Sequence, residues 1–181
     1  MNGLGINVRL RRVVIPDDYA FLRELYASRR EDLTNLPLPQ EQLAMLMDMQ
    51  YEAQRQGYGL EYPAAEHHII EIDSHAIGRL LVDRSNPNEI LLVDIAILPE
   101  HRGRGIGRKL ITDLIEEVAR DGRDLVLQVA PSNPAIKLYE RLGGTIVSSD
   151  EANVILKWSA ASACDERPPK HVELMQESLD V

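Results

Sequence analysis

The chain has 181 residues, of which 44% are hydrophobic and 27% charged, and its formal net charge is −9 at pH 7. This composition is typical of one soluble globular domain with a real core. The negative charge argues against nucleic acid or an acidic membrane as a partner of the whole surface. Because no apolar run approaches the roughly 20 residues of a membrane span and the N-terminus lacks the apolar stretch of a secretory signal, we expect a cytoplasmic protein.

The metal-binding residue types are few and badly spaced. A single cysteine, Cys164, excludes an intrachain disulfide and a cysteine-based metal site. His67 and His68 are adjacent, and no carboxylate at a fixed spacing accompanies them. We therefore expect no metal.

In the first half of the chain, hydrophobic periodicity and turn residues predict a strand, two helices and three further strands. The last of these strands is a nearly continuous apolar run, which is typical of a strand buried on both faces. A tight turn around Asp73 and Ser74 joins the first two of the three strands. The predicted elements are a strand over 7–14, a helix that begins near Pro16, a helix over about 40–56 that Gly57 and Gly59 end, and strands over 67–72, 76–84 and 89–98.

The second half begins with a helix over about 106–120. Its apolar residues Ile106, Leu110, Leu114 and Val118 are spaced by four and form one stripe. The elements after it are a strand over 125–130, a short helix within 131–144 that ends at a glycine, and strands over 145–149 and 153–158. This order of elements implies a mixed sheet covered by helices. We predict a single domain over 1–158 and a tail over 159–181.

The stretch "HRGRGIG" over 101–107 lies between a buried strand and a helix. It is neither a P-loop, since no Gly-Lys-Ser/Thr follows, nor a Rossmann fingerprint, since position 108 is Arg and position 128 is Gln. Glycines that expose successive N–H groups before a helix N-terminus are typical of an anion site. A tight turn with solvent-facing arginines is the alternative. Nucleic-acid binding is disfavoured because no aromatic residue interleaves with the basic ones.

Two spaced motifs resemble the GNAT superfamily of acyl-CoA-dependent N-acyltransferases over about residues 7–158. The first, "RGRGIG" over 102–107, matches the family's Arg/Gln-x-x-Gly-x-Gly/Ala signature, and the second is "NPAIKLYERLG" over 133–143. The resemblance implies an α/β (α+β) fold with a mixed, mostly antiparallel sheet of about seven strands and helices on both faces.

The resemblance also implies acetyl-CoA as cosubstrate and assigns roles to particular residues. The backbone of one strand would bind the pantetheine arm, the glycine loop would bind the pyrophosphate, and Asn133 would contact the cofactor. Tyr139 would lie beside the thioester sulfur and protonate the leaving thiolate, although packing on a helix face is its alternative role. The residues implied in cofactor binding are Ile95, Ala96, Ile97, Arg102, Gly103, Arg104, Gly105, Ile106, Gly107, Arg108, Asn133 and Tyr139.

Transfer of an acetyl group to an amine also needs a base, because the amine must be neutral to attack. Asp94 interrupts an apolar strand, where a charge is costly unless it is paired or useful. We take Asp94 as the candidate base, with a carboxylate bonded to a neighbouring strand or loop as the equal alternative. Some relatives that acetylate protein N-termini carry Glu at the position of Gln128, and glutamine cannot be a base. We therefore expect a small-molecule amine rather than a protein amine.

In this family the acceptor is usually recognised by the first two helices and their loop. The sequence leaves a homodimer open, and it leaves a non-catalytic acyl-CoA-binding or sensing module as the alternative to an N-acetyltransferase. The recognition region holds three tyrosines, three methionines and six acidic residues: Tyr51, Tyr58, Tyr62, Met45, Met47, Met49, Glu31, Asp32, Glu41, Asp48, Glu52 and Glu61. The methionines could form an adaptable wall or fill the core, and the acidic residues could attract a cationic amine or form a solvated face.

Overall fold

The computed structural model describes residues 7–160, except for the side chain of Glu31. Cys164 and most of the predicted tail lie outside these residues. Within them, no helix is long and apolar enough to cross a membrane. The elements are β1 (Val8–Arg12), α1 (Tyr19–Ala27), α2 (Glu31–Thr34), α3 (Gln40–Glu61), β2 (Glu66–Ile72), β3 (His75–Asp83), β4 (Glu89–Ile97), the 3-10 helix η1 (Pro99–His101), α4 (Ile106–Asp121), β5 (Asp124–Val129), α5 (Ile136–Arg141), β6 (Thr145–Ser149) and β7 (Val154–Trp158).

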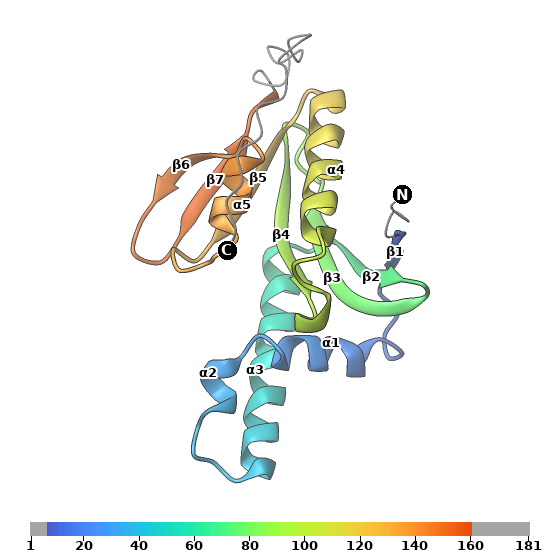
Figure 1. Ribbon diagram of the computed structural model, residues 1–181, viewed down its shortest axis with the longest axis vertical. Coiled ribbons are helices and arrows are strands. Elements are labelled where there is room, and N and C mark those ends of the chain that lie inside the picture. The colour runs from blue at the N-terminus through green and yellow to red at the C-terminus, as the bar shows by residue number, and fades with distance from the viewer. Residues whose placement is uncertain (1–6, 161–181) are drawn as a thin grey trace, which may run out of the picture.

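The strands form one seven-stranded sheet in the order β1-β2-β3-β4-β5-β7-β6. Only β4 and β5 are parallel, and every other neighbouring pair is antiparallel. The predicted mixed, mostly antiparallel sheet is therefore confirmed. Figure 1 shows β5, β6 and β7 diverging from β3 and β4, while α2 and the first turns of α3 extend beyond the sheet.

Each face of the sheet has its own core. On one face, the predicted stripe of α4 is fully buried and packs against Ile70, Leu80 and Ile90 of the strands. On the other face, α1 and α3 cover Ile69 and Ala96. Since side chains alternate along a strand, Asp94 lies on the same face as Ala96, the face that α1 and α3 cover.

The third helix is longer than the sequence predicts. We expected Gly57 and Gly59 to end it, but α3 continues to Glu61. A glycine inside a helix costs only about 1 kcal/mol relative to alanine, and packing can outweigh that cost. Tyr58 lies within this extension and its ring contacts the guanidinium of Arg79, with 5.5 Å from Cζ to the ring centroid. The buried residues of α3 are Met47 and Tyr51.

Strand β4 is only partly buried, contrary to the prediction that it is buried on both faces. Ile90, Leu92 and Ala96 are buried, whereas Val93 and Ile95 are half-buried. The cause is the loss of a neighbour, because β5 pairs with β4 only from Glu89 to Leu92. The half-buried stretch of β4 begins directly after Leu92, the last residue that pairs with β5. It therefore marks the place where the two strands separate.

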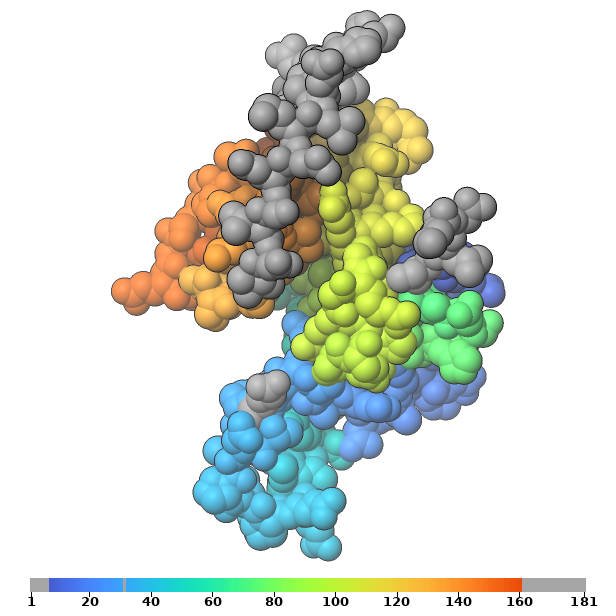
Figure 2. All heavy atoms as spheres, in the orientation of Figure 1, coloured from blue at the N-terminus to red at the C-terminus, as the bar shows by residue number. Residues whose placement is uncertain are grey.

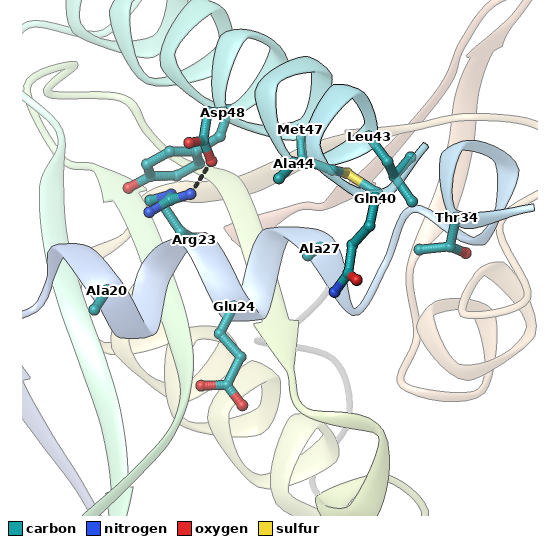
Figure 3. Close-up of a pocket in the computed structure, with 11 residues that line it drawn as sticks. Ala20, Arg23, Glu24, Ala27, Thr34, Gln40, Leu43, Ala44, Met47 and Asp48 are labelled. Atoms are coloured by element: carbon teal, nitrogen blue, oxygen red, sulfur yellow. Dashed lines mark hydrogen bonds and ion pairs between the residues drawn. The ribbon is translucent and has the colours of Figure 1, made fainter. Parts of the chain in front are cut away.

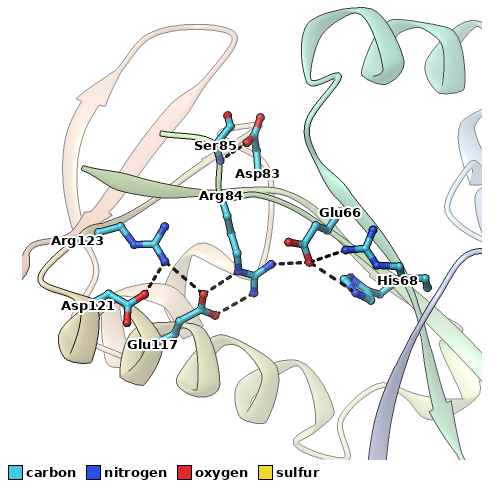
Figure 4. Close-up of polar contacts among 9 residues, drawn as sticks. Glu66, His68, Asp83, Arg84, Ser85, Glu117, Asp121 and Arg123 are labelled. Atoms are coloured by element: carbon cyan, nitrogen blue, oxygen red, sulfur yellow. Dashed lines mark hydrogen bonds and ion pairs between the residues drawn. The ribbon is translucent and has the colours of Figure 1, made fainter. Parts of the chain in front are cut away.

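A cluster of ion pairs joins the end of β3 to α4 (Figure 4). We call Arg84, Glu66, Glu117 and Arg123 the peripheral charge cluster. Arg84 donates to Glu117 from Nε and Nη2 at 2.7 and 2.9 Å, and its Nη1 lies 3.4 Å from Glu66. These side chains are partly exposed, at 16–32%, so the cluster is a solvated link between secondary-structure elements.

Candidate active site

A cleft opens where β4 and β5 separate. The two strands pair from Glu89 to Leu92 and from Asp124 to Leu127, and no further along. The cavity between them measures about 250 Å³. Its walls come from both strands, from the turn that precedes α5, from α5 itself and from the helices on the opposite face: Leu92, Val93, Asp94, Ile95, Leu127, Gln128, Val129, Ala130, Asn133, Tyr139, Arg29 and Tyr58.

One edge of β4 is paired along the cleft and the other is free. Ile95, Ala96 and Ile97 align with Leu80, Arg79 and Gly78 of β3. On the β5 side, the described residues provide no partner strand for these three. Backbone N–H and C=O groups are obligatory hydrogen-bonding groups, so this free edge can bind an extended ligand as an added strand would bind.

Gly78 makes this arrangement possible. A Cβ atom at Gly78 would lie 2.3 Å from the carbonyl oxygen of Ala96. No real Cβ contact is that short, so only glycine lets β3 run this close to β4 beside the cleft.

The glycine loop follows β4 and lies at the surface, in yellow-green in Figure 2. Gly103 and Gly105 have φ of +70° and +78°, which side chains rarely adopt, and a Cβ at either would meet nothing within 4 Å. Their role is therefore to shape the backbone and not to relieve crowding.

The loop leads directly into the start of α4. The first intrahelical bond of α4 runs from the Lys109 N–H to the Gly105 carbonyl at 2.9 Å. The amides of Ile106, Gly107 and Arg108 precede it and have no carbonyl partner within the helix. Together with the positive end of the helix dipole, they form the anion-binding geometry expected from the sequence.

Two of the loop's arginines have local partners. Arg102 donates from Nε to the carbonyl oxygen of Ile97 at 2.9 Å, which ties the loop back to the end of β4. Arg104 has its Nη1 3.3 Å from Nδ1 of His101. Arg102 thus helps to fix the turn that places the exposed amides.

Tyr139 reaches the cleft from α5. Its side chain is 4% exposed and lies edge-on to Trp158, with 6.3 Å between ring centroids. Burial raises the pKa of its hydroxyl, and the nearby Asp94 carboxylate raises the pKa further. The hydroxyl is therefore protonated at neutral pH, as an acid must be before it donates.

The turn before α5 is fixed by Asn133. Its Oδ1 accepts a hydrogen bond from the Ala135 N–H at 2.9 Å, which is an Asx turn at the start of the helix. Asn133 lines the cleft as well. Its amide nitrogen remains available to a ligand, and the turn positions the helix that carries Tyr139.

Asp94 is held by two arginines. Arg79 donates from Nε to Oδ2 at 2.7 Å, and Arg29 lies with Nη1 3.1 Å from Oδ1. Burial acts to raise the pKa of Asp94, but the two guanidinium groups outweigh it and hold the pKa below its usual value. The carboxylate bonded to a neighbouring strand, one of our two interpretations, is thus present, and a lowered pKa makes Asp94 a weak base.

Sequence reasoning missed the partners of Asp94. Arg79 is 4% exposed and donates from Nη2 to Gln54 at 2.9 Å. It lies diagonally across from Asp94, since Leu81 aligns with Asp94 and Arg79 shares the face of Leu81. A signal was present, because Arg79 and Asp94 are the charges in the interiors of two consecutive apolar strands. Arg29 and Tyr58 carry no comparable signal.

His67 and His68 point to opposite faces of β2. Burial lowers the pKa of His67 to about 4, and the Arg79 guanidinium adds to this shift; its Nε2 is buried without a hydrogen-bond partner. His68 lies 3.8 Å from Glu66, beside the peripheral charge cluster. Among the residues from 7 to 160, no three His, Cys, Asp or Glu side chains are grouped so that they could hold a metal ion.

The three methionines do not form one wall, which was one of the two interpretations of the sequence. Met45 and Met49 are exposed, at 72% and 61%, whereas Met47 is buried at 8%. Positions two apart on a helix face different directions, so Met47 fills the core and the other two face solvent. Tyr51 is buried in the same core, Tyr62 donates to Glu61, and of the three tyrosines only Tyr58 lines the cleft.

A second cavity, of about 420 Å³, lies between α1 and α3 (Figure 3). It is lined mainly by apolar side chains, among them Leu43 and Met47. Arg23 and Asp48 form an ion pair across its end. The cavity shares no lining residue with the cleft, and neither Tyr139 nor the glycine loop borders it.

The chain matches known acetyltransferases in sequence and in fold. A model of the acetyltransferase (GNAT) family matches residues 22–144. An L-2,4-diaminobutyric acid acetyltransferase of Nocardia farcinica is 33% identical over 70 residues, which are 37% of this chain and 36% of that protein. A ribosomal protein bS18-alanine N-acetyltransferase of Haemophilus influenzae is 36% identical over 73 residues, 40% of this chain and 50% of that one.

These aligned stretches span between 36% and 56% of the length of the curated relatives. Among solved structures, the PaiA N-acetyltransferase of Thermoplasma acidophilum in complex with coenzyme A superposes with a TM-score of 0.62 at 16% identity. That match covers 84% of this chain and 99% of the other. At this identity the likeness establishes the fold.

Proposed function

The chain belongs to the acetyltransferase (GNAT) family, and we propose that it transfers an acetyl group from acetyl-CoA to a primary amine. One arrangement carries the proposal: the free edge of β4 and the side chain of Tyr139 lie at one opening in the sheet, and the exposed amides at the start of α4 follow the end of that same strand. Each supplies a different requirement of the reaction, namely a place for an extended arm, an anion site and an acid.

Binding of the cosubstrate is assigned to three groups. The backbone of Ile95, Ala96 and Ile97 binds the pantetheine arm along the free edge of β4. The amides between Gly103 and Arg108 bind the pyrophosphate, and Asn133 contacts the cofactor from the other side of the cleft. The roles of β4 and of the loop rest on backbone groups and not on side chains, which fits an open loop with positive φ at two glycines.

Transfer itself is direct. The neutral amine attacks the thioester carbonyl, a C–N bond forms, and the C–S bond breaks to release the thiolate of coenzyme A. Tyr139 donates its phenolic proton to that thiolate, and a backbone N–H near Ile97 polarises the carbonyl. The proton that the amine loses passes to a base.

Asp94 was the candidate base, and its two guanidinium partners weaken it in that role. We propose instead that Asp94 positions Arg29 at the cleft. Asp94→Asn distinguishes a base from a positioning residue. If Asp94 is the base, its loss removes the acidic limb of the profile of kcat/KM against pH. An unaltered pH profile with a raised KM for the acceptor would support the positioning role.

Tyr139→Phe tests the acid. We expect kcat to fall about 100-fold, the usual contribution of a positioned acid, while the Kd of coenzyme A stays unchanged because the ring still packs on Trp158. The measurement is thiol release from acetyl-CoA across a panel of amines. A normal kcat in Tyr139→Phe removes this residue from the mechanism. Tight binding of coenzyme A by the wild type without turnover of any amine would instead support a non-catalytic acyl-CoA-binding module.

The acceptor is proposed to be a small molecule. Gln128 faces the cleft where it cannot act as a base, and the cavity of about 250 Å³ lies below the roughly 300–1,000 Å³ of sites for drug-sized ligands. The relatives include one named for diaminobutyric acid and one named for a ribosomal protein. A panel that contains both small amines and alanine-ended peptides separates the two classes.

A further inference from the structure

The one carboxylate that lines the cleft has two arginine partners, of which only one lines the cleft itself. Of its lining residues, only Arg29 and Asp94 are charged. Asp94 accepts hydrogen bonds on both oxygens, from Arg79 on Oδ2 and from Arg29 on both. Two guanidinium groups therefore surround one carboxylate, and the local charge is +1.

The surplus positive charge is accessible at Arg29 and not at Arg79. The Arg79 side chain is 5% exposed, while that of Arg29 is 38% exposed. Arg29 contacts Asp94 through Nη1 alone, at 3.1 and 3.3 Å. Among the described side chains, which do not include that of Glu31, its Nε and Nη2 have no hydrogen-bond partner, so these two parallel N–H donors face no described acceptor. That fork has the geometry that binds a carboxylate.

Two acidic residues of α3 do not offset this charge. Asp48 pairs with Arg23, and Glu52 pairs with Arg55, and neither carboxylate lines the cleft. A diamine or polyamine would place its second positive charge near Arg29, and among the described residues that line the cleft no unpaired carboxylate is present to receive it.

We propose that the acceptor is a small amine that also bears a carboxylate, of the amino-acid class, and that Arg29 binds this carboxylate. The inference rests on the proposed acetyl transfer and specifies its acceptor. Arg29 follows α1 and Tyr139 lies on α5, so the two border the same small cavity from opposite layers. A carboxylate held by Arg29 would direct the amine of the same molecule toward the thioester beside Tyr139.

The test compares matched acceptors in thiol release from acetyl-CoA. Each amino acid of a panel is assayed with its amide and with its decarboxylated amine, such as lysine, lysinamide and 1,5-diaminopentane. We expect the carboxylate form of the preferred acceptor to have a kcat/KM at least about tenfold above that of its amide, as loss of a charged hydrogen bond implies.

Three variants assign the effect to Arg29. Arg29→Gln should raise the KM for the carboxylate form by about 10- to 100-fold and leave the KM for the amide unchanged. In Arg29→Lys, the KM for the carboxylate form should lie between the values for the wild type and for Arg29→Gln. Arg55→Gln, which removes an arginine from the exposed side of α3, should change neither. Binding of coenzyme A to Arg29→Gln, measured by calorimetry, verifies that the cleft is intact.

Two results would overturn the inference while the proposed function stands. One is equal or better use of the amide and the diamine, and the other is an equal rise in KM for all three acceptors in Arg29→Gln. Absence of turnover with every amine would contradict the proposed function itself, and this inference with it.

Discussion

Among the clusters of arginine and carboxylate groups on this sheet, the one at the cleft and the peripheral charge cluster differ in burial. In the cleft, one carboxylate, Asp94, is shared by Arg79 and Arg29, and Asp94 and Arg79 have side chains exposed by 9% and 5%. In the peripheral charge cluster, one arginine, Arg84, is shared by Glu117 and Glu66, with exposures of 22–32%. Loss of a partner from a buried pair leaves an unsolvated charge, whereas a solvated pair is replaced by water. The first cluster therefore determines stability and the shape of the cleft, and the second is a surface link.

The largest effect is expected from Arg79→Leu. This change leaves Asp94 buried with only the partly exposed Arg29, and it also removes the bond to Gln54. We expect the free energy of unfolding to fall by about 3–5 kcal/mol. Urea unfolding at pH 7 measures it. If the free energy of unfolding falls by less than about 1 kcal/mol, the cleft cluster contributes no more than the peripheral charge cluster, and burial does not distinguish the two.

Gly78→Ala tests whether the close contact of β3 and β4 beside that cluster is needed. The added Cβ would lie 2.3 Å from the Ala96 oxygen, so the strands must shift, at a cost of about 1–3 kcal/mol. Urea unfolding reports the cost. The matched control is Gly57→Ala in α3, where a Cβ meets nothing within 4 Å and the helix should gain about 0.5–1 kcal/mol. Equal effects of the two would refute the close-contact argument.

His67→Gln compares the surroundings of the two clusters through the dependence of folding stability on pH. Burial lowers the pKa of His67 from 6.5 to about 4, so the unfolded chain binds more protons between these pH values. Folding stability conferred by the neutral imidazole is therefore present above pH 6.5 and declines as the pH falls toward 4. Between pH 7 and pH 5 the wild type should lose about 2 kcal/mol that His67→Gln retains.

The control for this pH effect is His68→Gln. His68 faces the peripheral charge cluster, where burial lowers its pKa and Glu66 opposes the shift. Its substitution should preserve less of the stability lost at pH 5. Urea unfolding of both variants at pH 7 and pH 5 measures how much of the lost stability each one retains. If His68→Gln retains more than His67→Gln, His67 is not the more strongly buried of the two histidines.

The smallest effect is expected from Arg84→Leu. Its partners Glu117 and Glu66 remain solvated, and Arg123 still lies 3.5 Å from Glu117. The loss should be at most about 1 kcal/mol, with no change in acetyl transfer. Thermal unfolding at low and at high salt measures the first, and thiol release measures the second. A loss as large as that of Arg79→Leu would show that burial does not distinguish the clusters.

The sequence predicted those parts of the fold that depend on local pattern. The stripe of Ile106, Leu110, Leu114 and Val118 is buried as a unit, and the turn at Asp73 and Ser74 has positive φ at both residues. The prediction that α3 ends at Gly57 and Gly59 was wrong, because Tyr58 contacts Arg79, a residue that is distant in the chain. Local propensity at Gly57 cannot reveal such a contact.

The candidate site divides in the same way. The glycine loop, Asn133 and Tyr139 follow from short motifs; Asn133 and Tyr139 line the cleft, and the glycine loop leads into the start of α4. Arg29 and Arg79 did not follow, because their relation to Asp94 spans 65 and 15 positions in the chain. Only the sheet register and the end of α1 bring these charges together, and those are consequences of tertiary packing.

The most direct test of the whole account is calorimetric titration of coenzyme A into the wild type and two glycine variants of α4. Gly105 and Gly122 cap opposite ends of this helix with φ of +78° and +69°, and a Cβ at either meets nothing within 4 Å. Valine at either position imposes a similar backbone strain. We predict that the wild type binds coenzyme A, that Gly105→Val binds at least about tenfold more weakly, and that Gly122→Val binds as the wild type does. Equal affinities in all three proteins, or no binding by the wild type, would contradict the assignment of the loop and the cleft.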